Sequence, residues 1–270
     1  MTGDFPAVEV RELSTLDECR SVDPFFESVW GPGTPPLGVE VLRALAHVGG
    51  YVAGAFAAND LVGVSVGFLA HRGEVSLHSH VTGVSATARG RGVGAALKAH
   101  QRQWALDRRL SSITWTYDPL VRRNAWFNIV KLGARPHEYL VDFYGPMGDA
   151  INGTDESDRL YMAWDLGLRQ TRPEPKTASS ASILACQDGA PVARTSRADQ
   201  VLVATPPDIE GLRRRRPDLA RTWRVALRTA LAAEMAGGHV VGFTRAGEYV
   251  VRRGVPEADR TAGSGGSFSS

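Results

Sequence analysis

The sequence predicts an α/β protein, in the mixed α+β sense, that ends in a small α+β C-terminal unit. Apolar, β-rich runs alternate with segments whose apolar residues recur at helical spacing. A glycine-rich turn, residues 89–94, joins an extended run to a helical one. A stretch rich in proline, serine and threonine, residues 169–182, separates this pattern from a second set of short strands and one helix.

The N-terminal part reads as a strand, two helices and a hairpin. Residues 8–13 form the first strand, and Thr15 with Glu18 matches a capping box at the start of a helix that runs towards Trp30. The elements expected next are a helix at 37–47, strands at 51–57 and 61–70 joined by a turn at Asn59-Asp60, and a long strand at 74–84.

Beyond the glycine-rich turn the helical and extended patterns continue to alternate. We expect a helix at 93–109, a strand at 113–117, a helix from Asp118-Pro119 to Gly133, and strands at 139–144 and 160–166. In the C-terminal unit we expect a hairpin at Asp188-Gly189, a strand at 201–205, a helix at 217–236 and a last hairpin around Gly247. The predicted organisation is 1–168 as one domain, 169–182 as a linker, 183–253 as the small unit and 254–270 as a disordered tail.

Composition and charge exclude several classes of protein. The formal net charge of +2 is too small to indicate a nucleic-acid or membrane-surface protein. Cys19 and Cys186 are far apart, which argues against a disulfide framework and against a cysteine metal cluster. No run approaches about 18 apolar residues, and the first ten residues lack the pattern of a signal peptide. We therefore expect a cytoplasmic protein with no nucleic-acid partner, no membrane and no metal.

The glycine-rich turn is the strongest motif, because such a turn presents backbone N–H groups to a phosphate at a helix N-terminus. The P-loop motif is absent, since no Gly-Lys is followed by Ser or Thr. The dinucleotide pattern G-x-G-x-x-G fits weakly, because its sixth position is Ala95 or Leu97, depending on the starting glycine. The pattern [Q/R]-x-x-G-x-[G/A] is satisfied in full by Arg89, Gly92 and Gly94.

With these residues the chain resembles the GNAT superfamily of N-acetyltransferases, and more narrowly predicted members that carry a C-terminal extension. The resemblance covers about residues 8–166 and includes the order of the elements. Lys131-Leu132-Gly133-Ala134 ends a helix roughly 40 residues after the turn, although the family usually has Gly-Phe at the last two positions. The resemblance implies a mixed, mostly antiparallel sheet flanked by helices, with acetyl-CoA as co-substrate.

The resemblance also implies which residues bind coenzyme A. The pyrophosphate would accept N–H bonds from the turn, and the pantetheine arm would pair with the end of the long strand. Arg122 and Arg123 would reach the 3′-phosphate or face solvent, and Asn124 and Asn128 would contact CoA or the acceptor, or form a polar outer face. The cofactor-binding residues expected are Val84, Ser85, Arg89, Gly90, Arg91, Gly92, Val93, Gly94, Ala95 and Asn124.

Acyl transfer to an amine calls for a base, because only about one alkyl amine in a thousand is unprotonated at neutral pH. His80 is the first choice and His78 its neighbour, with Glu74 as a more remote alternative. An equal alternative is that both histidines only form hydrogen bonds within a covered sheet face. Strand alternation would place on one face Ser76, His78, His80, Thr82 and Val84.

Two positions depart from the family pattern. The tyrosine expected four residues before the terminal glycine, which would protonate the thiolate, is Ile129, and the asparagine expected eleven before it is Arg122. Tyr144 is the best replacement for the missing acid, and Asp142 would lie on the same strand face and line the acceptor pocket. Asp118 could bind a cationic amine, although capping of the following helix is the favoured explanation.

The remaining charged residues are expected on the protein surface. Asp158-Arg159 is expected in a surface turn, and the run at 213–216 is expected on a solvated helix surface. The C-terminal unit has no motif that assigns it a role, so covering the acceptor pocket, forming a homodimer and stabilising the sheet remain three alternatives.

The predicted function is transfer of an acetyl or other short acyl group from CoA to a small-molecule amine. Direct attack is the expected mechanism, since no cysteine lies near the motifs. A non-catalytic acyl-CoA-binding sensor or subunit is one alternative, and a transferase with a larger acyl donor or a hydroxyl acceptor is another.

Overall fold

Two units account for the residues that the computed structural model describes, which are 5–33, 35–145, 147–148, 155–168 and 175–254. Unit 1 comprises Met1–Trp115, Asp149–Ile151 and Asp165–Leu168, and unit 2 comprises Thr116–Gly148, Asn152–Trp164 and Arg169–Ser270. The tail predicted at 254–270 lies outside the described residues after Gly254, and so do residues 169–174 of the predicted linker.

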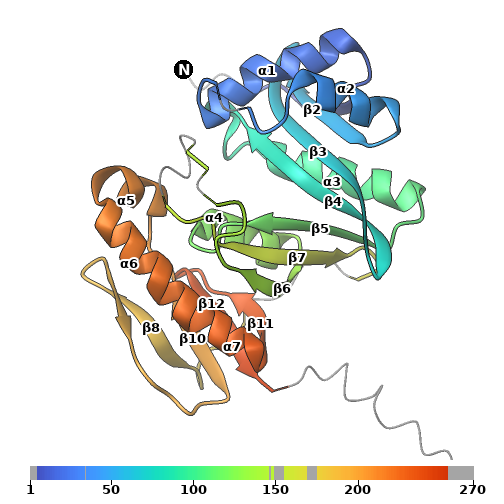
Figure 1. Cartoon of the computed structure of the whole chain (residues 1–270). Coiled ribbons are helices and arrows are strands. Elements are labelled where there is room, and N and C mark those ends of the chain that lie inside the picture. The colour runs from blue at the N-terminus through green and yellow to red at the C-terminus, as the bar shows by residue number, and fades with distance from the viewer. Residues whose placement is uncertain (1–4, 34, 146, 149–154, 169–174, 255–270) are drawn as a thin grey trace, which may run out of the picture. The chain divides into compact units, whose positions relative to one another are not determined.

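Unit 1 is a mostly antiparallel sheet with helices on both faces (Figure 1). Its strands follow one another across the sheet as β1 (Val8–Glu12), β2 (Tyr51–Ala57), β3 (Asp60–Arg72), β4 (Glu74–Val84) and β5 (Ser112–Tyr117), of which the residues up to Trp115 belong to this unit. Only β4 and β5 are parallel among these neighbours. The helices are α1 (Leu16–Trp30), α2 (Val39–His47), the short 3₁₀ turn η1 (Ala86–Ala88) and α3 (Val93–Asp107).

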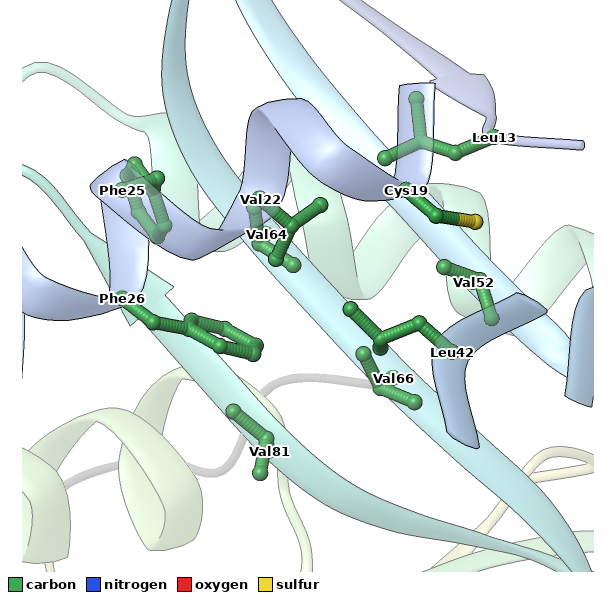
Figure 2. Packing of buried hydrophobic residues seen from close by; sticks show 10 residues of the cluster. All are labelled: Leu13, Cys19, Val22, Phe25, Phe26, Leu42, Val52, Val64, Val66 and Val81. Carbon is green, nitrogen blue, oxygen red and sulfur yellow. The ribbon is translucent and has the colours of Figure 1, made fainter. Parts of the chain in front are cut away.

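Apolar residues at helical spacing hold α1 and α2 against one face of this sheet. Phe26 of α1 and Leu42 of α2 are fully buried and pack with Val64 and Val66 of β3 (Figure 2). Each such side chain contributes about 1.5–3 kcal/mol through burial. On the opposite face α3 packs so closely on β3 that a Cβ at Gly63 would lie 2.8 Å from Val93.

Two local signals in unit 1, the capping box of α1 and the turn between β2 and β3, were predicted from the sequence. The capping box of α1 is present: the Glu18 N–H donates to Thr15 Oγ1 over 3.2 Å, and the Thr15 N–H donates to the Glu18 carboxylate over 2.9 Å. The hairpin turn between β2 and β3 was predicted at Asn59-Asp60, but β3 already begins at Asp60. Ala58 therefore takes the positive φ of 53° in the turn.

β4 contains a β-bulge at His80. Val66 of β3 lies opposite Val81, whereas the next residue, Gly67, lies opposite Ser79, so His80 is an extra residue in β4. A Cβ at Gly67 would lie 2.8 Å from the carbonyl oxygen of His78. The close approach of the two strands beside the bulge therefore depends on glycine at this position.

Unit 2 combines a strand pair with a five-stranded sheet. β6 (Arg135–Leu140) and β7 (Arg159–Asp165) are antiparallel. The sheet has the order β11 (Gly238–Phe243), β12 (Glu248–Arg253), β10 (Gln200–Ala204), β8 (Ala181–Gln187) and β9 (Ala190–Ala193), with β10 and β8 parallel. The helical segments are α4 (Arg122–Ala125), its π-helical continuation η2 (Trp126–Lys131), α5 (Ile209–Arg215), α6 (Pro217–Leu227), the π-helical η3 (Arg228–Ala232) and α7 (Ala233–Ala236).

The mixed α/β class is confirmed, and the predicted Asp188-Gly189 hairpin is present with φ angles of 49° and 80°. The bounds of two predicted elements in unit 2 are wrong. The helix expected from Asp118 begins at Arg122, because the Asp118 carboxylate turns back to accept the N–H of Leu120. The strand expected at 139–144 ends at Leu140, and a turn follows.

Candidate functional site

The turn predicted to bind phosphate joins β4 to α3. Gly90 and Gly92 have φ angles of 77° and 83°, which a residue with a Cβ adopts only under strain. Gly92 is the N-cap of α3, and its carbonyl accepts the first helical N–H, from Ala96, over 2.9 Å. Both positions therefore favour glycine, and they lie between η1 and the first turn of α3.

The N-terminus of α3 differs from that of α1. Within the described residues, no side chain caps α3 and its first turn holds no acidic residue, whereas α1 carries Thr15, Asp17 and Glu18 there. The N–H groups in the first turn of a helix lack helical partners and attract anions. Arg89 and Arg91 beside the turn are exposed and add positive charge. This end of α3 is suited to an anionic ligand.

Gly94 leaves room beside the first turn of α3. A Cβ built on it would be 3.9 Å from Val84, an ordinary contact, and its φ lies outside the left-handed region. Neither packing nor backbone conformation therefore demands glycine at this position. A ligand that approaches the helix backbone closely would benefit from it.

His78 and His80 share one face of β4, as predicted. Their ring centroids lie 6.4 Å apart, and both lie beside Phe68 of β3, at 5.4 and 5.6 Å. The Nδ1 atom of His78 lies 3.1 Å from Thr114 Oγ1 on β5. The strand face therefore presents two imidazoles next to an aromatic ring that is 36% exposed.

The predicted face is wrong beyond His80, because the bulge there interrupts the alternation of β4. The hydroxyl of Thr82 lies 2.9 Å from Ser65 Oγ, and Val84 packs with Val93 and the other residues that contact α3. Thr82 and Val84 thus point to the α3 side, whereas the histidines point away from it.

Burial sets the protonation state of both histidines. It lowers the pKa of His78 to about 4, with smaller contributions from His80 and Lys98, and it also lowers the pKa of His80. Because the charged form is disfavoured, both imidazoles are neutral at neutral pH, which is the form that can accept a proton.

The polar contacts between α3 and β4 were not foreseen from the sequence. Lys98 is 5% exposed, and its Nζ donates to Ser79 Oγ over 2.8 Å and to Gln101 Oε1 over 2.9 Å. The Nζ also lies 4.2 Å from the ring centroid of Trp115. Burial among neutral partners lowers the pKa of Lys98 to about 7. The available signal was its position beside Leu97, on the helix face that packs on the sheet.

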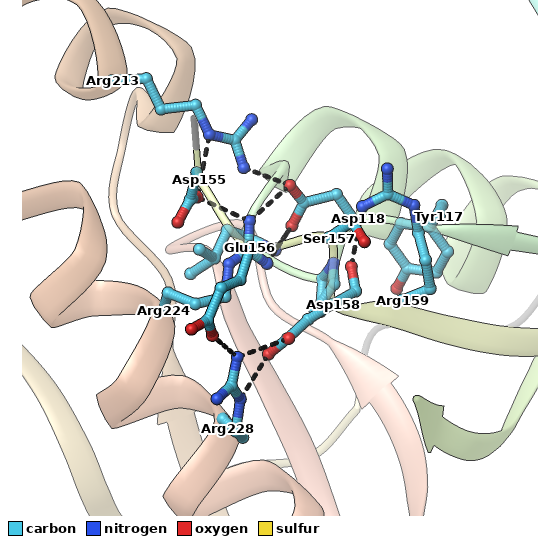
Figure 3. Close-up of polar contacts among 12 residues, drawn as sticks. Tyr117, Asp118, Asp155, Glu156, Ser157, Asp158, Arg159, Arg213, Arg224 and Arg228 are labelled. Atoms are coloured by element: carbon cyan, nitrogen blue, oxygen red, sulfur yellow. Dashed lines mark hydrogen bonds and ion pairs between the residues drawn. The ribbon is translucent and has the colours of Figure 1, made fainter. Parts of the chain in front are cut away.

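Unit 2 contains a buried network of arginines and carboxylates (Figure 3). Arg224 donates to both oxygens of Asp118 over 2.8 and 2.9 Å and to Asp155 over 2.8 Å, and Arg213 pairs with the same two carboxylates. Burial alone would raise the pKa of Asp118, but the two arginines hold it well below its usual value. With the Leu120 N–H bonded as well, an amine could bind Asp118 only by displacing an arginine.

A second part of the network surrounds Asp158. Arg228 donates to its two carboxylate oxygens over 2.7 and 2.9 Å, and the Tyr139 hydroxyl donates over 2.7 Å. Arg159 is 6% exposed. The surface turn predicted at Asp158-Arg159 is therefore wrong. The solvated run predicted at 213–216 is also wrong at Arg213, whose side chain is 7% exposed.

Asp142 and Tyr144 do not share a strand face, because they lie in a turn in which Asp142 has a φ of 44°. The Asp142 carboxylate accepts the N–H of Ser157 over 3.0 Å. The Tyr144 hydroxyl lies 3.2 Å from Thr116 Oγ1, and the guanidinium of Arg159 lies 5.3 Å from its ring centroid. Tyr144 is 40% exposed and so stays accessible to a ligand.

Of the other residues predicted to contact CoA, three lie on α4, and Asn128, which is 6% exposed, lies on η2. Arg122 donates to the hydroxyl and the carbonyl of Thr205, and Arg123 forms a two-fold hydrogen bond with Glu210. Both arginines are thus engaged by unit 2 itself. Asn124 is half-buried on α4.

The described part of the chain contains neither a cluster of metal ligands nor a helix that could cross a membrane. No group of three His, Cys, Asp or Glu side chains there is arranged to hold a metal ion. No helix among the same residues combines the length and the apolar character that crossing a membrane requires.

No protein-family model and no curated protein sequence matches this chain. It is similar to the GNAT-family acetyltransferase from Streptococcus pneumoniae, at 14% identity and a TM-score of 0.48, over 58% of this chain and 98% of that one. It is similar to the ribosomal-protein-S18-alanine N-acetyltransferase from Escherichia coli, at 10% and 0.48, over 60% and 96%. Naa50 from Arabidopsis thaliana, in complex with a bisubstrate analogue, is similar at 16% and 0.47, over 58% and 97%.

Proposed function

We propose that this protein transfers an acetyl or other short acyl group from coenzyme A to an amine of a small-molecule acceptor. The turn at 89–94 carries the proposal. It satisfies the CoA-binding pattern, and two glycines with positive φ lead into a helix without a side-chain cap. A helix N-terminus favours each negative charge by about 0.3–1 kcal/mol.

The donor is expected to bind along β4 and α3. The pyrophosphate accepts backbone N–H bonds from about Arg89 to Ala95, and the side chains of Arg89 and Arg91 add attraction. The pantetheine arm lies along the end of β4 at Val84 and Ser85. Asn124 remains a proposed CoA contact. Gly94 supports this arrangement, because the fold of unit 1 does not itself require glycine there.

In direct attack the amine nitrogen bonds to the thioester carbonyl carbon, the C–S bond breaks and CoA leaves as a thiolate. His80 takes the proton that the amine loses, with His78 as the second candidate for that role. The lowered pKa values keep both imidazoles in the neutral form that accepts a proton, but the pKa of about 4 makes His78 a weak base, which favours His80 for this role. Tyr144 is the proposed donor of a proton to the thiolate, and Asp142 is proposed to line the acceptor pocket.

Asp118 is left out of the proposed acceptor site because arginines already occupy its carboxylate. The cytoplasm as compartment, a homodimer as assembly and the division of the chain at 168 and 182 remain predictions.

The direct test is release of free CoA from acetyl-CoA by the purified chain with a panel of acceptors. We expect release above the acceptor-free rate with at least one small-molecule amine. Tight CoA binding without turnover on any acceptor would support the sensor alternative instead. Turnover confined to peptide N-termini, to hydroxyl compounds or to long-chain acyl-CoA would contradict the corresponding part of the proposal.

Alanine at two glycines with the same backbone strain, one inside the turn at 89–94 and one outside it, should show whether this turn holds the ligand. Gly92→Ala places a Cβ at a φ of 83°, so we expect at least about tenfold weaker CoA binding, since about 1–2 kcal/mol of strain distorts the turn. Gly73→Ala is the matched control, because Gly73 has a φ of 86° in the turn between β3 and β4, outside residues 89–94, so the same strain should leave CoA binding within about threefold. Calorimetric titration with CoA and thermal unfolding measure both. Equal CoA affinity in the two variants would argue against the turn as the pyrophosphate site.

A further inference from the structure

Four hydrogen bonds connect β4 to α3 and β3 around the bulge at His80. They begin at Ser79, immediately before the bulge, where Lys98 donates over 2.8 Å. Lys98 also donates to Gln101 over 2.9 Å, and Gln101 donates to Ser65 Oγ over 3.3 Å. Ser65 Oγ lies 2.9 Å from the hydroxyl of Thr82, back on β4. The network thus contacts β4 at Ser79 and at Thr82, which are the residues directly before and after His80 and Val81 in the sequence.

This arrangement restrains the part of β4 that the strand ladder does not. An extra residue in a bulge lacks an opposite partner, so the local backbone depends on other contacts for a single conformation. Ser79 and Thr82 point to the α3 side, and the His80 ring points to the other side, next to Phe68. Holding the two hydroxyl residues therefore also sets the direction of the imidazole between them.

The donors of this network belong to the helix that begins at the glycine turn. Lys98 and Gln101 lie on α3, whose N-cap is Gly92, and both side chains are buried. Their amino and amide groups would lose hydrogen bonds if β4 shifted, and unpaired buried polar groups are costly. A shift of the bulge relative to α3 is therefore unfavourable, because it would break these buried hydrogen bonds.

We propose that Lys98 and Gln101 are positioning residues that hold the bulge of β4 and thereby aim the His80 imidazole at the reaction site. The catalytic part of this inference rests on the proposed function, whereas the restraint on the bulge does not. Gln101 is the cleaner position for a test. The charge of Lys98 acts together with burial and His80 to lower the pKa of His78, so replacing it changes two properties at once.

Gln101→Leu should be compared with Gln103→Leu, the same substitution two residues along α3. Gln103 is exposed on the far side of the helix, where it donates to Asp107 over 2.8 Å. In Gln101→Leu we expect backbone amides at 80–82 to exchange about tenfold faster, as the loss of one or two buried hydrogen bonds implies. We also expect kcat to fall on the order of tenfold to a hundredfold, with KM for acetyl-CoA within about twofold. Gln103→Leu should leave all three quantities unchanged.

Unchanged exchange at 80–82 in folded Gln101→Leu would overturn the inference, and so would an equal effect in Gln103→Leu. If Gln101→Leu does not fold, Ser65→Ala tests the same connection, because it removes only the hydroxyl between Gln101 and Thr82. If amides at 80–82 exchange faster in Gln101→Leu but the wild type shows no acyl transfer, the inference that the network restrains the bulge stands and the proposed function is wrong. Faster exchange with unchanged kcat would keep the restraint and overturn the aiming of His80.

Discussion

Replacing His80 with alanine is expected to lower kcat by about 10²–10⁴-fold while changing CoA affinity by less than about twofold. The imidazole is the proposed base for the amine, and the groups proposed to hold the pyrophosphate are backbone N–H groups of the turn at 89–94. Turnover kinetics over a range of acceptor concentrations, together with titration of CoA, measure the two effects separately. An unchanged kcat would remove His80 from the reaction, and a loss only in His78→Ala would assign the base to His78.

The pH dependence adds a signature that a merely structural histidine would not give. Burial lowers the pKa of His80 below its ordinary 6.5, so its neutral, proton-accepting form prevails at neutral pH. The kcat/KM of the wild type should fall as the pH drops through this lowered value, and His80→Ala should lose that decline. His71→Ala is the matched control, because His71 is an exposed histidine on the same hairpin.

Asp118→Asn is expected to destabilise unit 2 by about 3–5 kcal/mol, because it leaves Arg213 and Arg224 without part of their buried counter-charge. Asp118 is 7% exposed, and the Arg224 side chain is fully buried. Asp208→Asn makes the same substitution at an exposed pair with Arg215, so a loss below about 1 kcal/mol is expected there. Hydrogen exchange of α6 amides and urea unfolding measure the difference, and equal losses in the two variants would contradict a buried role for Asp118.

The loss of stability in Asp118→Asn depends on pH in a definite direction. The folded-state pKa of Asp118 is lowered, so the stabilisation by its ion pairs is fully present above the ordinary value of 3.8 and is lost as the pH falls through the lower value. The difference between the wild type and Asp118→Asn should therefore be constant near neutral pH and shrink only in strong acid.

Local patterns in the sequence were sufficient for the order of the elements in unit 1, apart from the short η1, and for the turn at 89–94. The capping box at Thr15 and the glycines at 90 and 92 involve residues within a few positions of one another, so their spacing predicts their geometry. The strand from 74 to 84 was predicted with its observed bounds. The histidines at 78 and 80 also share a face as predicted, because the bulge comes only at His80.

Features that depend on distant partners could not be predicted in this way. The bulge arises from the pairing of β4 with β3, and the sequence of β4 alone does not predict it. Asp118 reads as a helix cap from its neighbour Pro119, but its partner Arg224 lies 106 residues later in the sequence. The strand expected at Tyr144 was overridden by the turn that the Asp142 carboxylate stabilises through the N–H of Ser157.

The lack of room for a Cβ at Gly67, beside the bulge, limits the mutations that this protein tolerates. Gly67 is buried on β3, and a Cβ there would meet the carbonyl oxygen of His78, a backbone atom that no side-chain rotation can move aside. Any other amino acid at 67 must therefore displace the strand that carries both histidines. A saturation library at this position should thus be depleted of every substitution, including alanine, in a selection for activity, although residue 67 itself offers no chemical group to the reaction.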